Sequence, residues 1–256
     1  MCDTCGCSDN DQGYTIKQPN QTEQKETTGH SHGHGHGHGH GHGAAEKIDL
    51  SASVLGKNNL LAERNRGFLE AKSIKCFNLV SSPGSGKTTL LEKLIEQLSS
   101  QQQIYVIEGD QQTTNDADRI ANAGAKSLQI NTGNGCHLDA AMVIDAVKQL
   151  MPDDNSLLFI ENVGNLVCPA LFDLGEKARI VIASVTEGAD KPLKYPNMFE
   201  TSHLCVINKT DLLPYVDFDV QQFKENALRI NHHLDFVEVS ATKGDGLDKL
   251  IEWVIA

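Results

Sequence analysis

The first 43 residues hold an unusual density of side chains that bind metal ions. Cys2, Cys5 and Cys7 form a C-x-x-C-x-C cluster at the amino terminus. Thiolates bind soft and borderline metals, and neutral imidazoles bind nickel, copper and zinc. Both groups predict metal binding, and the histidines predict a storage tract. In that tract histidine alternates with glycine, at His30, His32, His34, His36, His38, His40 and His42.

The two groups predict different kinds of site. Three sulfurs, completed by the terminal amine or Asp3, suit a planar nickel site as readily as a tetrahedral zinc site. A redox-active C-x-x-C pair is the alternative, but it requires a βαβ frame that this stretch lacks. Alternating glycines keep the histidine tract flexible, which favours a reservoir over a fixed catalytic site. The same alternation argues against a purification tag.

A phosphate-binding loop is predicted at residues 81–89, "SSPGSGKTT". It resembles the pattern G-x-x-x-x-G-K-[ST], in which backbone N–H groups surround phosphate oxygens. We expect Lys87 to reach the β- and γ-phosphates and the Thr88 hydroxyl to bind Mg²⁺. Ser81 departs from the pattern, which has glycine there. The predicted nucleotide-binding residues of this loop are Gly84, Ser85, Gly86, Lys87, Thr88 and Thr89.

A second motif concerns the base of the nucleotide. "NKTD", which comprises Asn208, Lys209 and Asp211, resembles the guanine-specificity motif of GTPases. A carboxylate there accepts hydrogen bonds from the guanine N1 and exocyclic amine, and adenine has no matching pair of donors. Ser240 and Ala241, in "SATKGDGL", look like the loop that contacts the guanine oxygen. The sequence therefore favours GTP over ATP and disfavours an ATP-dependent kinase.

Catalysis also needs carboxylates for Mg²⁺ and the attacking water. Asp110 and Glu161 each close a predicted strand, and with Lys87 they are the predicted catalytic residues. Thr88 and Asp110 are the predicted magnesium ligands. Gly164 completes a "Glu-x-x-Gly" that resembles the switch motif whose glycine N–H contacts the γ-phosphate. For Asp110, a helix cap or a surface charge is the alternative.

A second metal site is predicted at Cys136, His137 and Cys168. An adjacent Cys-His pair alone is more often incidental, and its side chains tend to diverge. A third ligand from the switch, or the same residues of a two-fold partner, would complete the geometry. Cys76 and Cys205 lie in apolar strands and are expected to be packed thiols.

The intervening residues predict an α/β fold. Apolar strands at 73–82, 103–110, 126–130, 156–164, 178–185, 203–211 and 235–241 alternate with helices at 86–98, 116–125, 138–150 and 246–255. This alternation predicts a mostly parallel sheet with helices on both faces, as in P-loop NTPases. A helical lead-in at 44–72, one or two helices broken near Gly56, precedes the domain at 73–256. Residues 1–43 form the predicted disordered metal-binding tail.

Charge and hydropathy exclude other classes. The net charge is −12, from 34 acidic and 22 basic residues, and no basic stripe appears, so nucleic acid is not an expected partner. No apolar run approaches membrane-spanning length, and the amino terminus lacks the apolar core of a signal peptide. We therefore expect a cytoplasmic protein that does not bind membranes, whose seven cysteines are thiols or metal ligands.

Together these motifs resemble the hydrogenase nickel-incorporation GTPases, the HypB family, from about Ala44 to Ala256. The resemblance is carried by "SSPGSGKTTLLE", "EGD", "NTGNGCHLDA", "ENVGNLVCP", "NKTDLLP" and "SATKGDGL", and "CDTCGC" looks like the tight nickel motif of some members. It implies a P-loop GTPase that dimerises with GTP and carries a weaker nickel or zinc site, Cys136, His137 and Cys168, at the dimer interface. The implied partners are a small nickel- and zinc-binding accessory chaperone, a His-rich prolyl isomerase where one is present, and the large-subunit precursor of [NiFe] hydrogenase.

Two rival functions stay open at this stage. A passive nickel store would use the tail alone, with an incidental GTPase. A maturation GTPase for urease or for a cobalt enzyme would be expected to carry a Cys-Pro-His-type or Cys-x-Cys-Cys-type motif where this chain has Gly-Cys-His. The short spacing from Gly164 to Cys168 favours a switch in which GTP hydrolysis moves Cys168 relative to Cys136 and His137.

Lys87→Ala is expected to abolish GTP hydrolysis without affecting metal binding by the tail, because the tail ligands lie outside the phosphate loop. Phosphate release and nickel uptake by the full chain measure the two effects. Nickel tolerance of cells that survives Lys87→Ala would favour the passive store.

Overall fold

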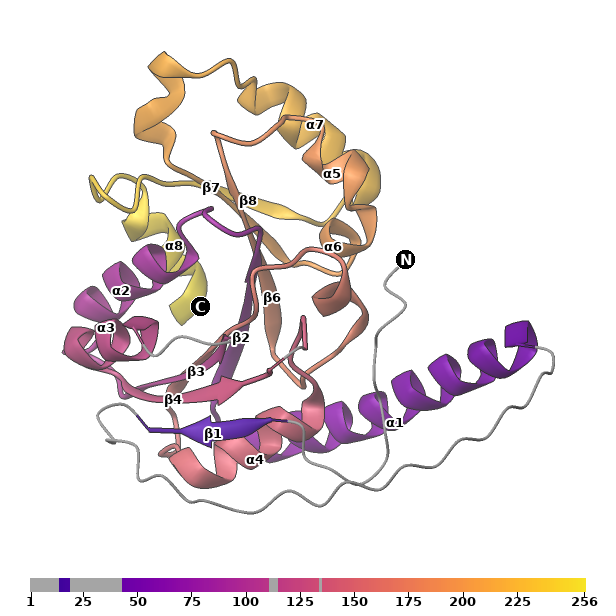
Figure 1. Ribbon diagram of the computed structural model, residues 1–256. Coiled ribbons are helices and arrows are strands. Elements are labelled where there is room, and N and C mark those ends of the chain that lie inside the picture. The colour runs from indigo at the N-terminus through magenta and orange to yellow at the C-terminus, as the bar shows by residue number, and fades with distance from the viewer. Residues whose placement is uncertain (1–13, 19–42, 111–114, 134) are drawn as a thin grey trace.

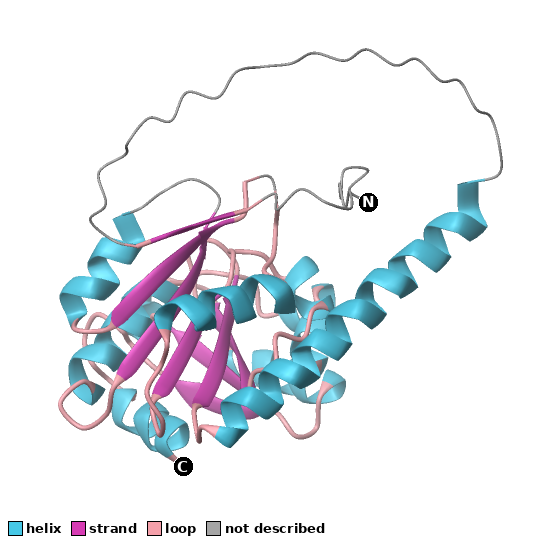
Figure 2. Ribbon diagram, turned by 90° about the horizontal axis from the view of Figure 1, so that it is seen from below, coloured by secondary structure: helices cyan, strands magenta, loops and turns pink. Residues whose placement is uncertain are grey.

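The computed structural model describes residues 14–18, 43–110, 115–133 and 135–256. In this part of the chain eight strands form one sheet in the order β1-β4-β3-β5-β2-β6-β7-β8. Every pairing is parallel except that of β1 with β4, which is antiparallel. Helices lie on both faces of the sheet (Figures 1 and 2). The predicted fold class, a P-loop NTPase with a mostly parallel sheet, is confirmed.

Strands and helices alternate along the chain from β2 onward. The strands are β1 (Thr15–Lys17), β2 (Lys75–Ser81), β3 (Ile104–Asp110), β4 (Lys126–Asn131), β5 (Leu157–Glu161), β6 (Ala178–Ser184), β7 (Leu204–Asn208) and β8 (Asp235–Glu238). The α-helices are α1 (Gly43–Ala71), α2 (Lys87–Leu98), α3 (Asn115–Ala123), α4 (Ala140–Leu150), α5 (Lys191–Lys194), α6 (Pro196–Glu200), α7 (Val220–Ile230) and α8 (Leu247–Ile255). Two 3₁₀ helices are η1 (Cys168–Leu171) and η2 (Thr210–Tyr215).

The two faces of the sheet bury separate apolar cores. On one face α2, α3 and α8 pack over alternate strand residues such as Leu79 and Ile180. On the other, α1 and α4 cover β3, β4 and β5, while α6 and α7 cover β6 and β7. Each fully buried aliphatic side chain contributes about 1.5–3 kcal/mol relative to an exposed one. Burial on both faces explains why the strands are continuously apolar rather than alternating.

The sheet has its topological switch point at β2. The chain runs from β2 outward to β3 and β4, returns to β5, and then continues through β6, β7 and β8 on the other side. In open parallel sheets, ligands bind beyond the carboxyl ends of the strands at such a point. The loops after β2, β3, β5 and β7 therefore converge on one edge.

Two features of the helices differ from the sequence prediction. α1 runs unbroken through Gly56, although a break was expected there. Glycine in a helix costs only about 1 kcal/mol relative to alanine, and helix formers flank it on both sides. In addition, α7 lies between β7 and β8, where the apolar pattern alone named no helix; Phe223 and Ala227 anchor it to the sheet.

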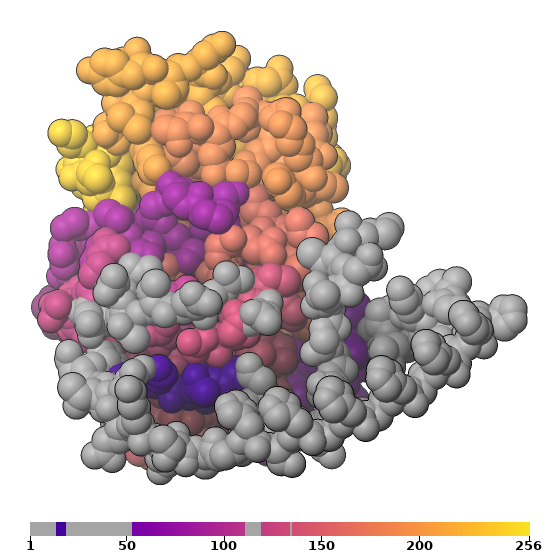
Figure 3. All heavy atoms as spheres, viewed as in Figure 1, coloured from indigo at the N-terminus to yellow at the C-terminus, as the bar shows by residue number. Residues whose placement is uncertain are grey.

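The tail contributes an unexpected strand. β1 lies within the segment predicted to be disordered, and Ile16 pairs with Ile130 of β4. The prediction is wrong for these residues because Tyr14 and Ile16 pack against the core under α4, and the Tyr14 hydroxyl donates to Asp145 Oδ2 at 2.8 Å. β1 is visible at the surface beside β4 in Figures 1 and 3. Residues 1–13 and 19–42, with Cys2, Cys5, Cys7 and the histidine tract, lie outside the described residues.

No helix in the described part of the chain combines the length and apolar character needed to cross a bilayer.

Tyr14→Phe is expected to loosen β1 while leaving the rest of the fold intact. The variant keeps the ring and removes one hydrogen bond, worth about 1 kcal/mol, so the β1 amides should exchange with deuterium roughly fivefold faster. Tyr215→Phe is the matched control, since Tyr215 is 82% exposed. Equal β1 exchange in all three chains would contradict the anchoring role of Tyr14.

Candidate functional site

The loop between β2 and α2 has the geometry of a phosphate cradle. Gly84 and Gly86 have φ values of 76° and 91°, in the left-handed region that favours glycine. At Gly86 a Cβ atom would lie 2.6 Å from Asn208 Nδ2, so no side chain fits there. Ser81, the departure from the pattern, is buried as the last residue of β2 and is not among the residues with positive φ, so glycine is not needed at that position.

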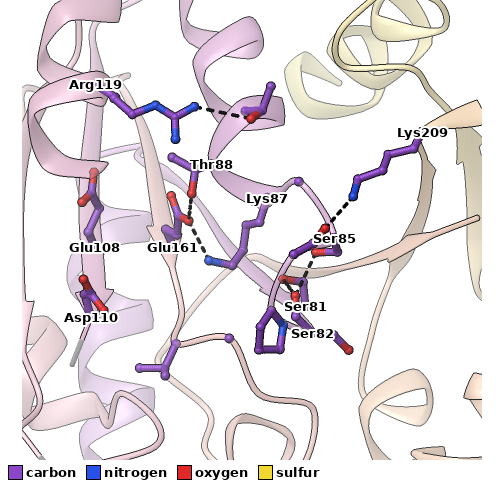
Figure 4. A pocket seen from close by; sticks show the side chains of 17 residues that line it. Ser81, Ser82, Ser85, Lys87, Thr88, Glu108, Asp110, Arg119, Glu161 and Lys209 are labelled. Atoms are coloured by element: carbon purple, nitrogen blue, oxygen red, sulfur yellow. Dashed lines mark hydrogen bonds and ion pairs between the residues drawn. The ribbon is translucent and has the colours of Figure 1, made fainter. Parts of the chain in front are cut away.

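This loop opens onto a cavity of about 480 Å³ at the carboxyl edge of the sheet. The volume falls within the range of small-molecule sites. Figure 4 shows the side chains that line it. From the sequence prediction, the lining includes Gly84, Ser85, Gly86, Lys87, Thr88, Thr89, Asp110, Glu161, Gly164 and Lys209.

Glu161 is the central acceptor of the cavity. Lys87 Nζ and Thr88 Oγ1 both donate to its Oε1, at 2.6 and 2.7 Å. The Lys87 and Glu161 side chains are 12% and 6% exposed, so the ion pair is largely shielded from water. The contact joins the start of α2 to the end of β5 (Figure 4). Oε2 of Glu161 is buried and has no hydrogen-bond partner among the described residues.

These oxygens fit a magnesium ion. Mg²⁺ prefers carboxylate and hydroxyl oxygens together with phosphate and water. Thr88 Oγ1 and the buried Glu161 carboxylate lie in contact, and Asp110 lines the same cavity from the end of β3. A hard divalent cation would supply the unpartnered Glu161 Oε2 with a counter-charge, so the donor set suits this ion.

Two charged residues of the cavity were missed by sequence reasoning. Glu108 is buried and pairs across the sheet with Glu161, and it lines the cavity with Asp110. Glu108 and Asp110 are two apart in one strand and so point to the same face, which was the available signal. Arg119 of α3 also lines the cavity; its Nε and Nη2 donate to Glu92 at 2.9 and 2.7 Å. Nothing in the local sequence separated Arg119 from an ordinary surface arginine.

The residues predicted to recognise guanine form one connected loop beside the cradle. Asn208 Nδ2 donates to Ser85 O at 2.9 Å, and Lys209 Nζ donates to Gly84 O at 2.6 Å. Asn208 Oδ1 accepts from the backbone N–H of Ala241 at 3.2 Å. These bonds fix the loops after β7 and β8 to the cradle, so base and phosphate sites share one frame.

The Asp211 side chain is oriented by a hydrogen bond from Ser240. The Ser240 hydroxyl donates to Asp211 Oδ1 at 2.6 Å, which orients the carboxylate and leaves Oδ2 to accept from a ligand. Ser240 is fully buried, whereas Asp211 is partly exposed. The structure thus joins Asp211 to Ser240, and their recognition of guanine stays a prediction.

The structure brings Cys136, His137 and Cys168 together within one chain. One ligand atom from each lies within 4.8 Å of the others. The two sulfur atoms are 2.9 Å apart, and Cys136 Sγ lies 3.7 Å from His137 Nδ1. Neither cysteine forms a disulfide bond, and both are partly exposed. Cys168 thus lies where it could supply the third ligand that the adjacent pair lacked, and three such ligands would suit a tetrahedral ion with its fourth position open.

Neighbouring side chains contact the Cys136–His137–Cys168 cluster and orient its residues. The His137 ring stacks on Phe172 with centroids 3.9 Å apart. Burial lowers the pKa of His137, although the Asp139 charge partly opposes this, so the neutral imidazole that binds metals is favoured. Asn165 donates to Cys136 O at 3.2 Å and accepts from Val167 N at 2.8 Å, so one side chain spans both ligand-bearing segments.

Cys76 and Cys205, by contrast, are fully buried in β2 and β7. Burial raises the pKa of both thiols, which keeps them protonated and unreactive. The prediction that they are packed thiols is confirmed.

Nickel or zinc is expected to protect Cys136 and Cys168 from alkylation in the full chain. A metal-bound thiolate is a poor nucleophile, so labelling by iodoacetamide, followed by mass spectrometry, should slow at least tenfold at saturation. His137→Ala should weaken this protection. Cys76 and Cys205 are internal controls that stay unlabelled with or without metal, and metal-independent labelling of Cys136 would contradict the site.

Comparison with known proteins shows the family of the chain. The family described as CobW/HypB/UreG, nucleotide-binding domain, matches residues 75–238. Hydrogenase maturation factor HypB of Escherichia coli strain K12 is 54% identical over 207 residues, covering 81% of this chain and 71% of that protein.

Solved structures give the same result. Hydrogenase maturation factor HypB from Archaeoglobus fulgidus is 40% identical with a TM-score of 0.73, over 78% of this chain and 98% of that one. HypB from Helicobacter pylori, in complex with nickel, is 37% identical with a TM-score of 0.74, over 78% and 94%. With its phosphate cradle and its Cys136–His137–Cys168 cluster, the chain belongs to the HypB family of hydrogenase maturation factors.

Proposed function

We propose that this chain is a GTP-hydrolysing nickel metallochaperone that binds, stores and delivers nickel for maturation of the [NiFe] hydrogenase large subunit. One observation carries the proposal. Residues 161–168 form a continuous segment that touches the phosphate cradle at one end, where Glu161 meets Lys87, and the metal cluster at the other, where Cys168 meets Cys136. Nucleotide and metal therefore act on the same short piece of chain.

The cavity residues take separate parts in hydrolysis. Lys87 and the cradle N–H groups hold the β- and γ-phosphates and neutralise their charge. Asp110 and Thr88 would hold magnesium, which would supply positive charge to offset the negative charge that develops on the phosphate oxygens. Glu161 orients the attacking water, whose oxygen bonds to the γ-phosphorus as the bond from that phosphorus to the β–γ bridging oxygen breaks. GDP and phosphate are the products.

The exchange of contacts at Glu161 supplies the switch. A bound triphosphate needs the Lys87 ammonium and the Thr88 hydroxyl, which Glu161 Oε1 also uses. Nucleotide binding must therefore redirect Glu161 and move the segment that follows it. Gly164 approaches Pro83 of the cradle so closely that a Cβ atom would lie 3.3 Å from its ring, and Gly164 itself lines the cavity.

The tail gains a defined point of attachment through β1. Thr15 pairs with Asn131 in antiparallel register, so the amino-terminal end of β1 lies beside the end of β4 from which the chain continues to Cys136. Cys7 precedes Thr15 by eight residues, and Cys136 follows Asn131 by five. Eight residues reach at most about 28 Å, which is enough to bring the tail cysteines to the domain cluster. This supports transfer of nickel from the tight N-terminal site, refilled by the histidine tract, to Cys136, His137 and Cys168, which can hold nickel or zinc.

Partner contacts are expected around the same cluster. Val167 and Leu171 flank Cys168 and are 58% and 50% exposed, an apolar surface that suits a second copy of the chain in a GTP-dependent homodimer. The accessory nickel and zinc chaperone, a His-rich prolyl isomerase where present, and the hydrogenase large-subunit precursor are the proposed partners in transfer. A cytoplasmic location follows from those partners.

Asp211→Asn is expected to lower GTP affinity by roughly 10²–10⁴-fold, because the amide no longer accepts from both guanine donors. Xanthosine triphosphate carries a carbonyl in place of the exocyclic amine of guanine. It should bind the variant better than GTP does, because the amide N–H of asparagine can donate to that carbonyl. Asp217→Asn changes an exposed aspartate nearby and serves as the control. Unchanged guanine preference in Asp211→Asn would remove the assignment of GTP.

Hydrogenase activity in a strain that lacks this gene tests the function as a whole. The wild-type chain should restore activity at low nickel, and Cys136→Ser should restore it only when nickel is added in excess. Cys205→Ala, which alters a buried thiol of β7 that is not one of the clustered ligands, should behave as wild type. Full rescue by Cys136→Ser at low nickel would contradict delivery through the domain site.

A further inference from the structure

A buried polar network lies beneath the two sites and is used by neither. Asn78 and Asn162 are fully buried, and Glu176 and Arg179 are 8% and 4% exposed. Asn78 stands in the middle of the apolar strand β2, where an amide is costly unless every polar atom is bonded. Buried groups of this kind, fully satisfied, fix one arrangement of the surrounding chain.

Asn162 connects the segment 161–168, which begins at the phosphate cradle, with the turn that carries Cys136 and His137. It follows Glu161 directly in the chain, and its side-chain oxygen accepts from Val163 N at 3.0 Å and from Leu138 N at 3.3 Å. Val163 adjoins Gly164 in the switch, and Leu138 adjoins His137 in the metal cluster. One oxygen atom therefore holds both segments.

The direction of these hydrogen bonds is set by an ion pair. Arg179 donates to Glu176 Oε1 from Nε and Nη2, at 3.2 and 3.1 Å. Asn78 must turn its amino group toward that carboxylate, and donates to it at 3.0 Å. Its oxygen then faces Asn162, which donates to it at 3.3 Å. The oxygen of Asn162 is left for Leu138 and Val163, and the amide orientations follow without ambiguity.

The same ion pair also holds the segment that carries Cys168. Arg179 Nη1 donates to Ala170 O at 3.2 Å and Nη2 donates to Phe172 O at 2.9 Å. Ala170 belongs to η1, which begins at Cys168, and Phe172 stacks on His137. The network therefore reaches His137 through Leu138 and Phe172, and it reaches the segment that carries Cys168 through Ala170.

We propose that the Asn78–Asn162–Glu176–Arg179 network transmits the nucleotide state to the metal cluster, with Asn162 as the positioning residue that links them. The inference rests on the proposed coupling of GTP and nickel and names the side chain that carries it. A shift of Glu161 on exchange of nucleotide also moves Asn162, because the two residues are adjacent in the chain. The bonds to Leu138 and Val163 must then lengthen or move together, which changes the spacing of His137 and Cys136 relative to Cys168.

Nickel titrations of the full chain in two nucleotide states test this link. Cys136 alkylation at buffered free nickel gives the nickel concentration that half-protects the domain site, whatever the tail binds. For wild type the half-protecting concentration should differ at least fivefold between GDP and a non-hydrolysable GTP analogue. In Asn162→Ala the two concentrations should agree within about twofold, while nucleotide affinity stays close to wild type, because Asn162 does not line the cavity.

Asn226→Ala is the matched control. Asn226 belongs to α7, is 5% exposed and donates to Ala189 O at 3.0 Å, and it is part of neither the cavity nor the metal-ligand cluster. The variant should retain the wild-type ratio, which a general loss of stability would not explain. Equal ratios in wild type and Asn162→Ala, both different from one, would overturn the network while leaving the proposed function intact. A ratio of one in wild type would overturn the coupling itself.

Hydrogen exchange in wild type provides a second readout that needs no variant. The Leu138 and Val163 amides share one acceptor, so both should change protection together when GDP is replaced by the GTP analogue. If Asn162→Ala does not fold, this measurement decides: a Leu138 amide that is indifferent to nucleotide contradicts the link.

Discussion

The site depends on one carboxylate, Glu161, and its contacts with Lys87 and Thr88. These contacts tie the end of β5 to the start of α2 in a setting that water scarcely reaches. Burial of an ion pair costs desolvation, so such a pair contributes more to a defined arrangement than to stability. Any group that competes for Lys87 and Thr88 acts on Glu161 with little screening. In the proposed mechanism, the residue that responds to phosphate is therefore the first residue of the segment that ends at Cys168.

Rigid and movable parts are cleanly separated around this contact. Three apolar core clusters fix the strands from both faces, so the strand ends hold their positions. The loops beyond those ends are joined to one another by side-chain hydrogen bonds, from Asn208 to the cradle and from Asn162 and Asn165 to the metal turn. Packed cores are not continuously deformable, so a change at the cavity is expected to pass through these loops.

The sequence predicts well the features formed by contiguous residues, and it predicts poorly the features formed by residues that are distant in sequence and meet only in the fold. The cradle at 81–89 and the motif at 208–211 are contiguous, and each follows an apolar strand, so their place in the fold could be inferred. Glu108 and Arg119 lack a local pattern, and they join the cavity only because β3 lies beside β5 and α3 lies beside α2. The sequence does not predict β1, because Tyr14 and Ile16 are isolated apolar residues in a polar segment and the strand is stabilised only by their packing against β4 and α4. The meeting of Cys136 with Cys168 was proposed from chain spacing near the switch, but the Asn78–Asn162 contact that underlies it joins residues 84 apart.

The central claim is that phosphate and nickel bias one segment, and thermodynamic linkage makes it reciprocal. The most direct measurement is the affinity of the full chain for the GTP analogue and for GDP, each without nickel and at saturating nickel. The account predicts that nickel changes the ratio of the two nucleotide affinities by the same factor that nucleotide changes nickel affinity, and that Cys136→Ser removes the change. A ratio that nickel leaves unaltered would contradict it.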